Sequence, residues 1–186
     1  MNRLIVVSVG TDHHPFDRLV TMMDSWALTH PGDSVIIQYG TAMAPTTATG
    51  HKLIPHPELC DLFGRADVVI CHGGPSTVMD ARMAGKKPLV LPRDPARGEH
   101  VDGHQIRFAK HIDRHGLART LNSEDDIAQA IEDVLADPLH YSIASEQREA
   151  PPGVVQFGRA IDDLLGTSTP LVRPSTPQRE TPGLGS

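Results

Sequence analysis

Residues 66–81, ADVVICHGGPSTVMDA, decide the fold of this chain, because in them a buried strand runs directly into a helix. The apolar, β-branched run at 66–71 is typical of a strand buried on both faces of a parallel sheet. The pair Gly73-Gly74 ends that strand, and the following helix is expected to reach about Ala84, where Gly85 stops it. A strand, a glycine turn and a helix in this order form the repeating unit of α/β folds.

The same alternation continues on both sides of this segment. It predicts an α/β fold, a Rossmann-like parallel sheet with helices on both faces. One helix is expected to be capped by Ser123, with Asp126 three residues later. Residues 1–165 are predicted to form one domain, and the Pro/Ser/Thr-rich residues 166–186 a disordered tail. Further strands are predicted at 4–9, 35–38, 52–54, 88–91 and 116–120, and helices at 15–26, 57–63, 103–115, 123–135 and 154–165.

The composition excludes several classes of protein. The 186 residues are 39% apolar and 22% charged, with a formal net charge of -6, which argues against nonspecific nucleic-acid binding. Two cysteines, Cys60 and Cys71, are too few for a disulfide framework and are expected to be reduced in a cytoplasmic protein. No stretch approaches 18 apolar residues, and the first strand is too short for a signal peptide. Membrane contact is therefore expected only through a partner or a surface patch.

The glycine turn at 73–74 is a candidate phosphate site. Backbone N–H groups at a helix start are unpaired and carry the positive end of the helix dipole, which suits a diphosphate. Asp80 follows one turn later, where a carboxylate can accept hydrogen bonds from ribose hydroxyls. The turn is not a Walker loop, and Gly10-Thr11 lacks the further glycines of a dinucleotide fingerprint. A plain glycine turn with an acid near the helix start is the structural alternative.

A second polar cluster, at 99–105, follows another predicted strand. It contains Glu99, His100, Asp102, His104 and Gln105. Ligands of open α/β sheets bind beyond the carboxyl ends of the strands, so this cluster, the first strand end and the glycine turn should share one crevice.

Together these segments resemble the C-terminal, UDP-sugar-binding domain of family 28 glycosyltransferases, one half of a GT-B fold. The resemblance rests on VSVGT at 7–11, FDRL at 16–19, residues 72–81 and the pair His104-Gln105, and it covers about residues 3–165. It is closest to small single-domain members that work as split pairs with a membrane-anchored partner. The family's larger peptidoglycan enzyme has Glu at the position of Asp80, whereas the small split members commonly have Asp.

The resemblance also implies a site. The backbone of Ile54 would hold the uracil, Asp80 the ribose, and His104 and Gln105 the donor sugar. The residues around the diphosphate would be Gly10, Thr11, His72, Gly73, Gly74, Pro75, Ser76 and Thr77.

The implied function is that of an inverting glycosyltransferase subunit, acting in the cytoplasm or peripherally at the membrane through its partner. It would transfer N-acetylglucosamine or a related hexose from a UDP-sugar to a lipid-linked or polysaccharide acceptor, with no metal or other cofactor. The partner would bind the acceptor and supply the general base, since only His13 and His14 are local candidates. The alternatives are a nucleotide-sugar-binding module without activity and an epimerase-like enzyme on UDP-sugars, which needs a second domain.

Other residues admit a simple structural interpretation. His72 is more typical of a hydrogen-bonded histidine near the core than of a catalytic group. The pairs His100/His104 and His111/His115 have helical spacing but lack the glutamate of a zinc-protease helix, so no metal site is predicted. A basic cluster is expected to be a solvated face, or else a surface for lipid phosphate or for the partner. It comprises Arg82, Lys86, Lys87, Arg93 and Arg97.

Overall fold

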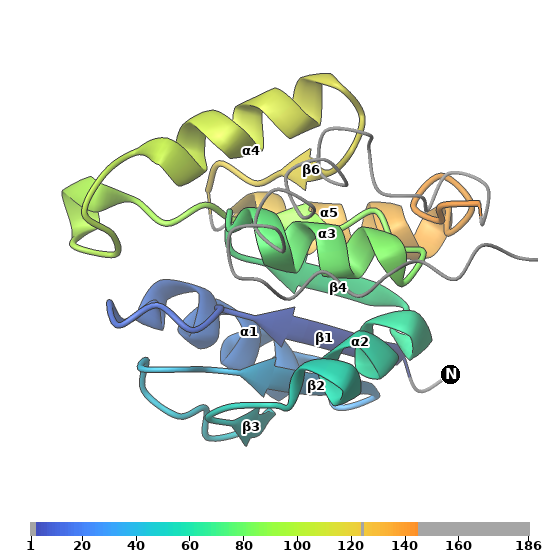
Figure 1. Cartoon of the computed structure of the whole chain (residues 1–186). Helices are drawn as coiled ribbons and strands as arrows, with labels where there is room; N and C mark the ends of the chain where they lie inside the picture. Colours follow the sequence, from blue (N-terminus) through green and yellow to red (C-terminus); the bar gives the residue numbers. More distant parts are fainter. Residues whose placement is uncertain (1–2, 124, 145–186) are drawn as a thin grey trace, which may run out of the picture. The chain divides into compact units, whose positions relative to one another are not determined.

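A computed structural model of the chain describes residues 3–123 and 125–144, which form a parallel sheet between two helical layers (Figure 1). The sheet has six strands in the order β3-β2-β1-β4-β5-β6, and each pair of neighbours is parallel. The α/β fold predicted from the sequence is confirmed. The strands are β1 (Arg3–Ser8), β2 (Asp33–Gln38), β3 (Thr49–His51), β4 (Val68–Cys71), β5 (Leu89–Val90) and β6 (Arg119–Thr120).

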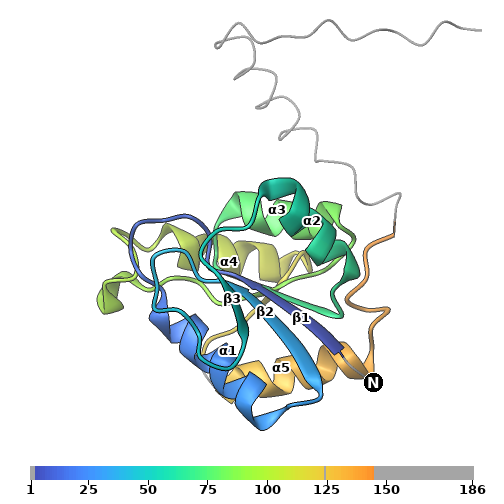
Figure 2. The same cartoon turned by 90° about the horizontal axis from the view of Figure 1, so that it is seen from below.

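Helices cover both faces of the sheet, α1 and α5 on one side and α2, α3 and α4 on the other (Figure 2). All four residues of β4 are buried, as expected for a strand covered on both faces. The helices are α1 (Asp17–Thr29), α2 (His56–Arg65), α3 (Pro75–Met83), α4 (His104–Arg114) and α5 (Asp125–Ala136), with a short 3-10 helix η1 (Pro95–Arg97).

Local sequence signals explain two helix boundaries. Ser123 and Asp126 form the expected capping box: Asp126 N donates to Ser123 Oγ at 3.3 Å, and Ser123 N donates to Asp126 Oδ2 at 3.2 Å. Gly85 follows α3 with φ of 87°, a left-handed conformation that favours glycine and ends the helix as predicted.

One strand lies earlier than predicted. The short strand expected at 52–54 is wrong, because the edge strand β3 pairs through Thr49, Gly50 and His51 with the end of β2. All three residues of β3 are exposed and none is apolar in its side chain, so hydrophobicity does not mark the strand. Ile54 instead packs in the apolar cluster under α2.

The order of the strands places a crevice between β1 and β4. The chain leaves β1 toward β2 on one side, and it enters β4 and then β5 on the other, so the connections diverge at this point. Ligands of open α/β sheets bind at this switch point, beyond the carboxyl ends of the strands. In the described residues, no helix has both the length and the apolar character needed to cross a bilayer. The helix predicted at 154–165 and the tail at 166–186 lie outside the described residues.

Candidate functional site

A cavity of about 390 Å³ opens at the switch point. Among its lining residues are many that the sequence predicts to bind the donor, namely Gly10, Thr11, Ile54, His72, Gly74, Ser76, Thr77 and Asp80. They come from the ends of β1 and β4, the segment before α2, and the first turns of α3. Residues from three separate stretches of the sequence thus meet in one place.

The first turn of α3 points free backbone donors toward this cavity. Gly74 is the N-cap residue and is extended, no side chain caps the helix, and Pro75 occupies its first turn. The N–H groups of Ser76 and Thr77 have no intrahelical acceptor at these positions. No acidic residue lies in the first turn, so the positive end of the helix dipole is not neutralised there.

His72 lies between the two glycines of the cavity. A Cβ atom built on Gly10 would come within 2.7 Å of His72 Nε2, and one on Gly74 within 2.9 Å of His72 Cδ2. Gly10 also has φ of 76°, a left-handed conformation that favours glycine, so two separate constraints act at this position. The glycines therefore let the imidazole fill the space between two backbone segments.

The imidazole of His72 is neutral at physiological pH. Only 8% of the residue is exposed, and burial, reinforced by the charge of Arg93, lowers its pKa to about 4. Its backbone N donates to Ser8 O at 3.2 Å, whereas its Nδ1 has no hydrogen-bond partner in the described part of the chain. His72 therefore lies near the core as the sequence suggests, but its ring Nδ1 lacks the hydrogen bond that this interpretation expected.

Gln38 is a lining residue that the sequence reasoning missed. It is 2% exposed; its Nε2 donates to Ser8 Oγ at 3.2 Å, and its Oε1 accepts from Ile54 N at 3.0 Å. The available signal was a polar residue that closes an apolar strand at the carboxyl edge of the sheet. Because Gln38 occupies the N–H of Ile54, the carbonyl of Ile54 is the backbone group left for a ligand.

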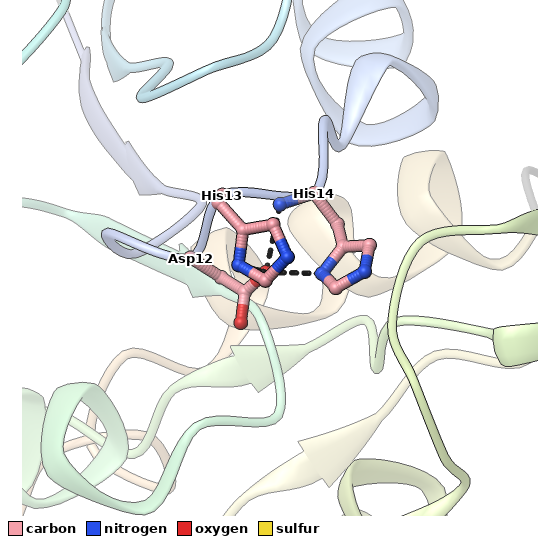
Figure 3. A group of neighbouring side chains, drawn as sticks. All are labelled: Asp12, His13 and His14. Atoms are coloured by element: carbon pink, nitrogen blue, oxygen red, sulfur yellow. Dashed lines mark hydrogen bonds and ion pairs between the residues drawn. The ribbon is translucent and has the colours of Figure 1, made fainter.

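Asp12 holds a group of histidines beside the cavity (Figure 3). Its Oδ1 accepts from the backbone N of His14 at 2.8 Å and lies 2.7 Å from His14 Nδ1, and its Oδ2 lies 3.4 Å from His100 Nε2. Burial would raise the pKa of Asp12, but the bonds from His14 and the charges of Arg93 and His100 outweigh this and lower it to about 2. The ionised carboxylate only accepts, so His14 carries its proton on Nδ1 and leaves Nε2 as the basic nitrogen.

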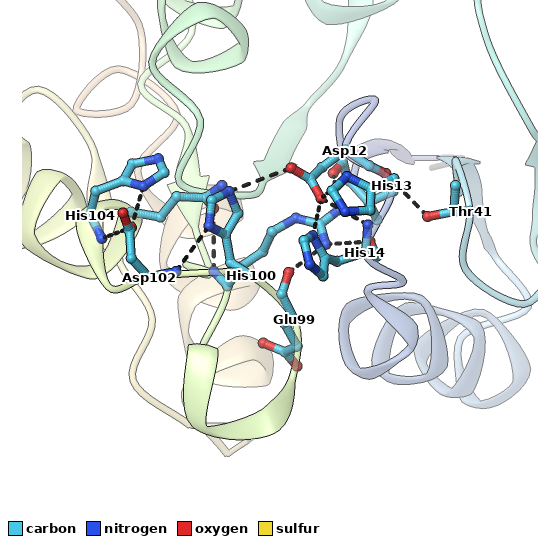
Figure 4. Close-up of polar contacts among 11 residues, drawn as sticks. Asp12, His13, His14, Thr41, Glu99, His100, Asp102 and His104 are labelled. Carbon is cyan, nitrogen blue, oxygen red and sulfur yellow. Dashed lines mark hydrogen bonds and ion pairs between the residues drawn. The ribbon is translucent and has the colours of Figure 1, made fainter.

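The two histidines predicted as base candidates differ in their surroundings (Figure 4). The side chain of His13 is 82% exposed, whereas that of His14 is 23% exposed and held by Asp12. His14 also faces the ring of His100, with 5.8 Å between the ring centroids. Of the pair, only His14 has the fixed orientation that a general base needs.

Arg93 is buried, which corrects the prediction of a solvated basic face. It is 1% exposed; Nη1 donates to His14 O at 2.7 Å and to Glu99 O at 3.0 Å, and Nη2 donates to Val9 O at 2.8 Å. Arg82 is similarly used, donating to Leu117 O. Arg97 lies 3.7 Å from Asp94, and Lys87 lies over the ring of Tyr141. The sequence cluster therefore does not form one continuous basic surface.

The remaining predicted residues lie at the edge of the site. Gly73 allows α4 to approach, since a Cβ there would lie 3.0 Å from Gln105 O. Gln105 is buried, and its Oε1 accepts from Arg93 N at 3.4 Å. His104 is exposed, and its ring is held by Asp102, with 2.5 Å between Nδ1 and Oδ1. His104 and Gln105 do not line the cavity as the side chains stand.

The sequence matches the family "Glycosyltransferase family 28 C-terminal domain" over residues 4–157. Among curated relatives, the UDP-N-acetylglucosamine--N-acetylmuramyl-(pentapeptide) pyrophosphoryl-undecaprenol N-acetylglucosamine transferase of Pseudomonas entomophila (strain L48) is 27% identical over 164 residues. That match covers 81% of this chain and 45% of the relative, so the chain spans less than half of that protein's length.

Solved structures support the fold. MurG of Acinetobacter baumannii superposes with a TM-score of 0.56 and 21% identity, over 90% of this chain and 50% of that one. The solution structure of ALG13 superposes with a TM-score of 0.54 and 16% identity, over 84% of this chain and 94% of that one. The superposition thus covers nearly the whole of ALG13 and half of MurG.

Proposed function

Because the chain belongs to the family of glycosyltransferase family 28 C-terminal domains, we propose that it is the donor-binding subunit of an inverting glycosyltransferase. Its donor is a UDP-sugar, with N-acetylglucosamine or a related hexose as the group transferred. The acceptor is lipid-linked or a polysaccharide, and a membrane-anchored partner subunit binds it. The named activity of the Pseudomonas relative, an N-acetylglucosamine transferase acting on an undecaprenol-linked substrate, supports this choice of donor and acceptor.

The observation that carries the proposal is the arrangement of α3 and His72 around the cavity. The uncapped start of α3 offers the N–H groups of Ser76 and Thr77 to a diphosphate, and the His72 ring, packed against Gly10 and Gly74, forms the floor beside them. Asp80 lines the same cavity one turn further along α3, at the place where a ribose would follow. An anion site followed by a carboxylate is the pattern that a nucleoside diphosphate requires.

The uracil and the sugar, at the two ends of the donor, are assigned to protein groups that remain free to bind them. Ile54 would meet N3–H of uracil through its carbonyl oxygen, because Gln38 occupies its N–H. At the other end, His104 is exposed whereas Gln105 is buried, so His104 is the more accessible of the two for a sugar hydroxyl.

The chemistry is a direct displacement at the anomeric carbon. The leaving diphosphate gains negative charge, and the dipole and free N–H groups of α3 stabilise it without a metal ion. The acceptor hydroxyl must lose a proton as it attacks, and the partner subunit supplies the base for that step. His14 is the local alternative, because Asp12 holds its ring with Nε2 as the basic nitrogen.

The test is nucleotide binding by the full chain, measured by calorimetry. We expect UDP and UDP-sugars to bind more tightly than ATP or NAD. Asp80→Ala should weaken UDP binding by about 1–3 kcal/mol, the usual loss for charged hydrogen bonds left unmade. Asp61→Ala, an exposed acid on α2 that does not line the cavity, is the matched control and should bind UDP normally.

Two outcomes would contradict the assignment. Equal or tighter binding of ATP would overturn the choice of nucleotide. An Asp80→Ala protein that melts early but keeps its affinity for UDP would make Asp80 a structural residue of α3.

A further inference from the structure

Three different metal-binding side chains meet at one edge of the donor cavity. His56 and Cys60 lie one turn apart on the same face of α2, and Asp80 reaches toward them from α3. His56 Nε2 lies 3.1 Å from Asp80 Oδ2 and 3.6 Å from Cys60 Sγ, and the three ligand atoms all lie within 4.8 Å of one another. A nitrogen, a sulfur and an oxygen donor therefore converge from two helices.

The separations match those of ligands around a tetrahedral zinc ion. The usual zinc–nitrogen, zinc–sulfur and zinc–oxygen bond lengths place tetrahedral ligand atoms about 3.4–3.6 Å apart. The two separations from His56, 3.1 Å to Asp80 and 3.6 Å to Cys60, differ little from these values, and the third, between Cys60 and Asp80, is within 4.8 Å. Three protein ligands leave a fourth position open for water.

Two other groups of possible ligands in the described residues are less suitable. In Asp12-His13-His14 and in His100-Asp102-His104, one carboxylate oxygen already accepts a backbone N–H and faces the Nδ1 of the same histidine. The first group lies in one loop, the second lies in the loop before α4 and at the first residue of that helix, and neither contains sulfur. The group on α2 and α3 instead joins two packed helices and includes a thiol, a ligand that favours zinc over magnesium or calcium.

The local charge also favours a cation. The carboxylates of Asp80 and Asp61 both lie close enough to Cys60 to act on it electrostatically. The same two carboxylates attract a divalent ion, which binds the thiolate as the thiol proton is released to solvent. Cys60 is only half-buried, so the ion has access from solvent.

We propose that His56, Cys60 and Asp80 form a binding site for Zn²⁺, and that the bound ion competes with the nucleotide for Asp80. The site itself follows from the geometry of the three side chains. The competition rests on the proposed function, because it requires Asp80 to bind the ribose.

The first test uses the full chain without a histidine tag and needs no nucleotide. Cys60 is the only reactive thiol expected in the folded protein, because Cys71 is completely buried. Stoichiometric Zn²⁺ should slow alkylation of Cys60 at least about tenfold, and a chelator should restore the rate. Alkylation at an unchanged rate with saturating Zn²⁺ would overturn the site.

The second test measures Zn²⁺ binding to variants by calorimetry. Cys60→Ser and His56→Ala should each weaken it at least about tenfold, since even partners outside the first ligand shell of a metal contribute this much. His111→Ala is the matched control: His111 forms a similarly spaced pair with His115, but belongs to no group of three ligands in the described residues. Equal affinity in Cys60→Ser and the unmodified chain would contradict the proposal.

The third test separates the site from the proposed function. Zn²⁺ should lower the apparent affinity of the unmodified chain for UDP, and it should lower that of Cys60→Ser far less. Because the phosphates of UDP bind Zn²⁺ equally in both experiments, the comparison with Cys60→Ser corrects for that binding. Cys60 does not line the cavity, so this variant should bind UDP normally without Zn²⁺. Zn²⁺ binding that leaves the UDP affinity unchanged would disprove the competition. Failure of UDP to bind at all would disprove the proposed function and leave the metal site standing.

Discussion

His72 should make the stability of the fold sensitive to mild acid. Its pKa is about 4 in the folded chain and about 6.5 when unfolded, so between these values the unfolded state binds more protons. The free energy of unfolding should therefore fall by roughly 3 kcal/mol as the pH drops from 6.5 to 4. Asp12 and Asp24 both have a pKa of about 2 in the folded chain, so their contributions to the free energy of unfolding should be lost only below about pH 3.8.

Urea denaturation at pH 7, 5.5 and 4.5 checks this prediction. His72→Gln, which cannot titrate, should show a much flatter dependence over the same range. His111→Gln, an exposed histidine on α4, should behave like the unmodified chain. A steep loss of stability in His72→Gln would assign the effect to other groups.

Single residues show which parts of the site a sequence can predict. The positions of His72, Gly74 and Asp80 follow from local order, because a strand, a turn and one helical turn fix them relative to each other. Gln38 and Asp12 could not be assigned in this way. Their roles depend on which strand lies beside β1 and on how the loop before α4 folds back, and local sequence specifies neither.

Arg93 connects the elements around the site. Its guanidinium donates to carbonyls in the loop between β1 and α1 and in the loop before α4, and it lies over the ring of Phe16, 4.8 Å from the centroid. Beside it, Arg18 at the start of α1 forms a two-point ion pair with Glu99, at 2.8 and 2.7 Å. These contacts fix the loop between β1 and α1, which carries His13 and His14, against the loop before α4.

Arg93→Leu should therefore cost at least about 3 kcal/mol of unfolding free energy, because the buried carbonyls of Val9 and Glu99 and the part-buried carbonyl of His14 lose their donor. Arg93→Lys should not restore it, since a single ammonium cannot reproduce the fork of a guanidinium. Urea midpoints give the measurement, with the exposed Arg97→Leu as the control, expected to change stability by less than about 1 kcal/mol. A stable Arg93→Leu would show that water replaces these bonds.

The order and type of the elements were predictable because strands buried on both faces and amphipathic helices have distinct patterns. β1, β4 and α3 lie close to their predicted places. β3 was misplaced by three residues, since an exposed edge strand is defined by pairing with its neighbour rather than by its own composition. Arg93 was misjudged for a similar reason: the sequence shows its charge, but only the packed loops show the carbonyls that it binds.

For the molecule as a whole, the proposed function predicts that donor binding and transfer can be separated. The purified chain should bind UDP-sugar but transfer little sugar to a lipid-linked acceptor, because the partner holds the acceptor and the base. If the proposed partner is membrane-anchored, membranes from the source organism should restore transfer. Product formation from radiolabelled UDP-N-acetylglucosamine provides the measurement.

His14→Ala is the informative variant in this assay. It should retain most of its activity with membranes, since the proposed function assigns the base to the partner. Robust transfer by the chain alone that His14→Ala abolishes would instead place the base on Asp12 and His14, and it would contradict the requirement for a partner.

The contact between His72 and the two glycines also limits the order in which mutations could accumulate here. Gly74 has φ of -80°, which any residue can adopt, and the atoms nearest to a side chain at this position all belong to the imidazole. Gly74→Ala should be harmful alone but tolerated after His72→Ser, whereas Gly10, with φ of 76°, should remain restricted in both backgrounds. A lineage that keeps the histidine is thus confined to glycine at both places, and replacement of Gly74 must follow a change at His72.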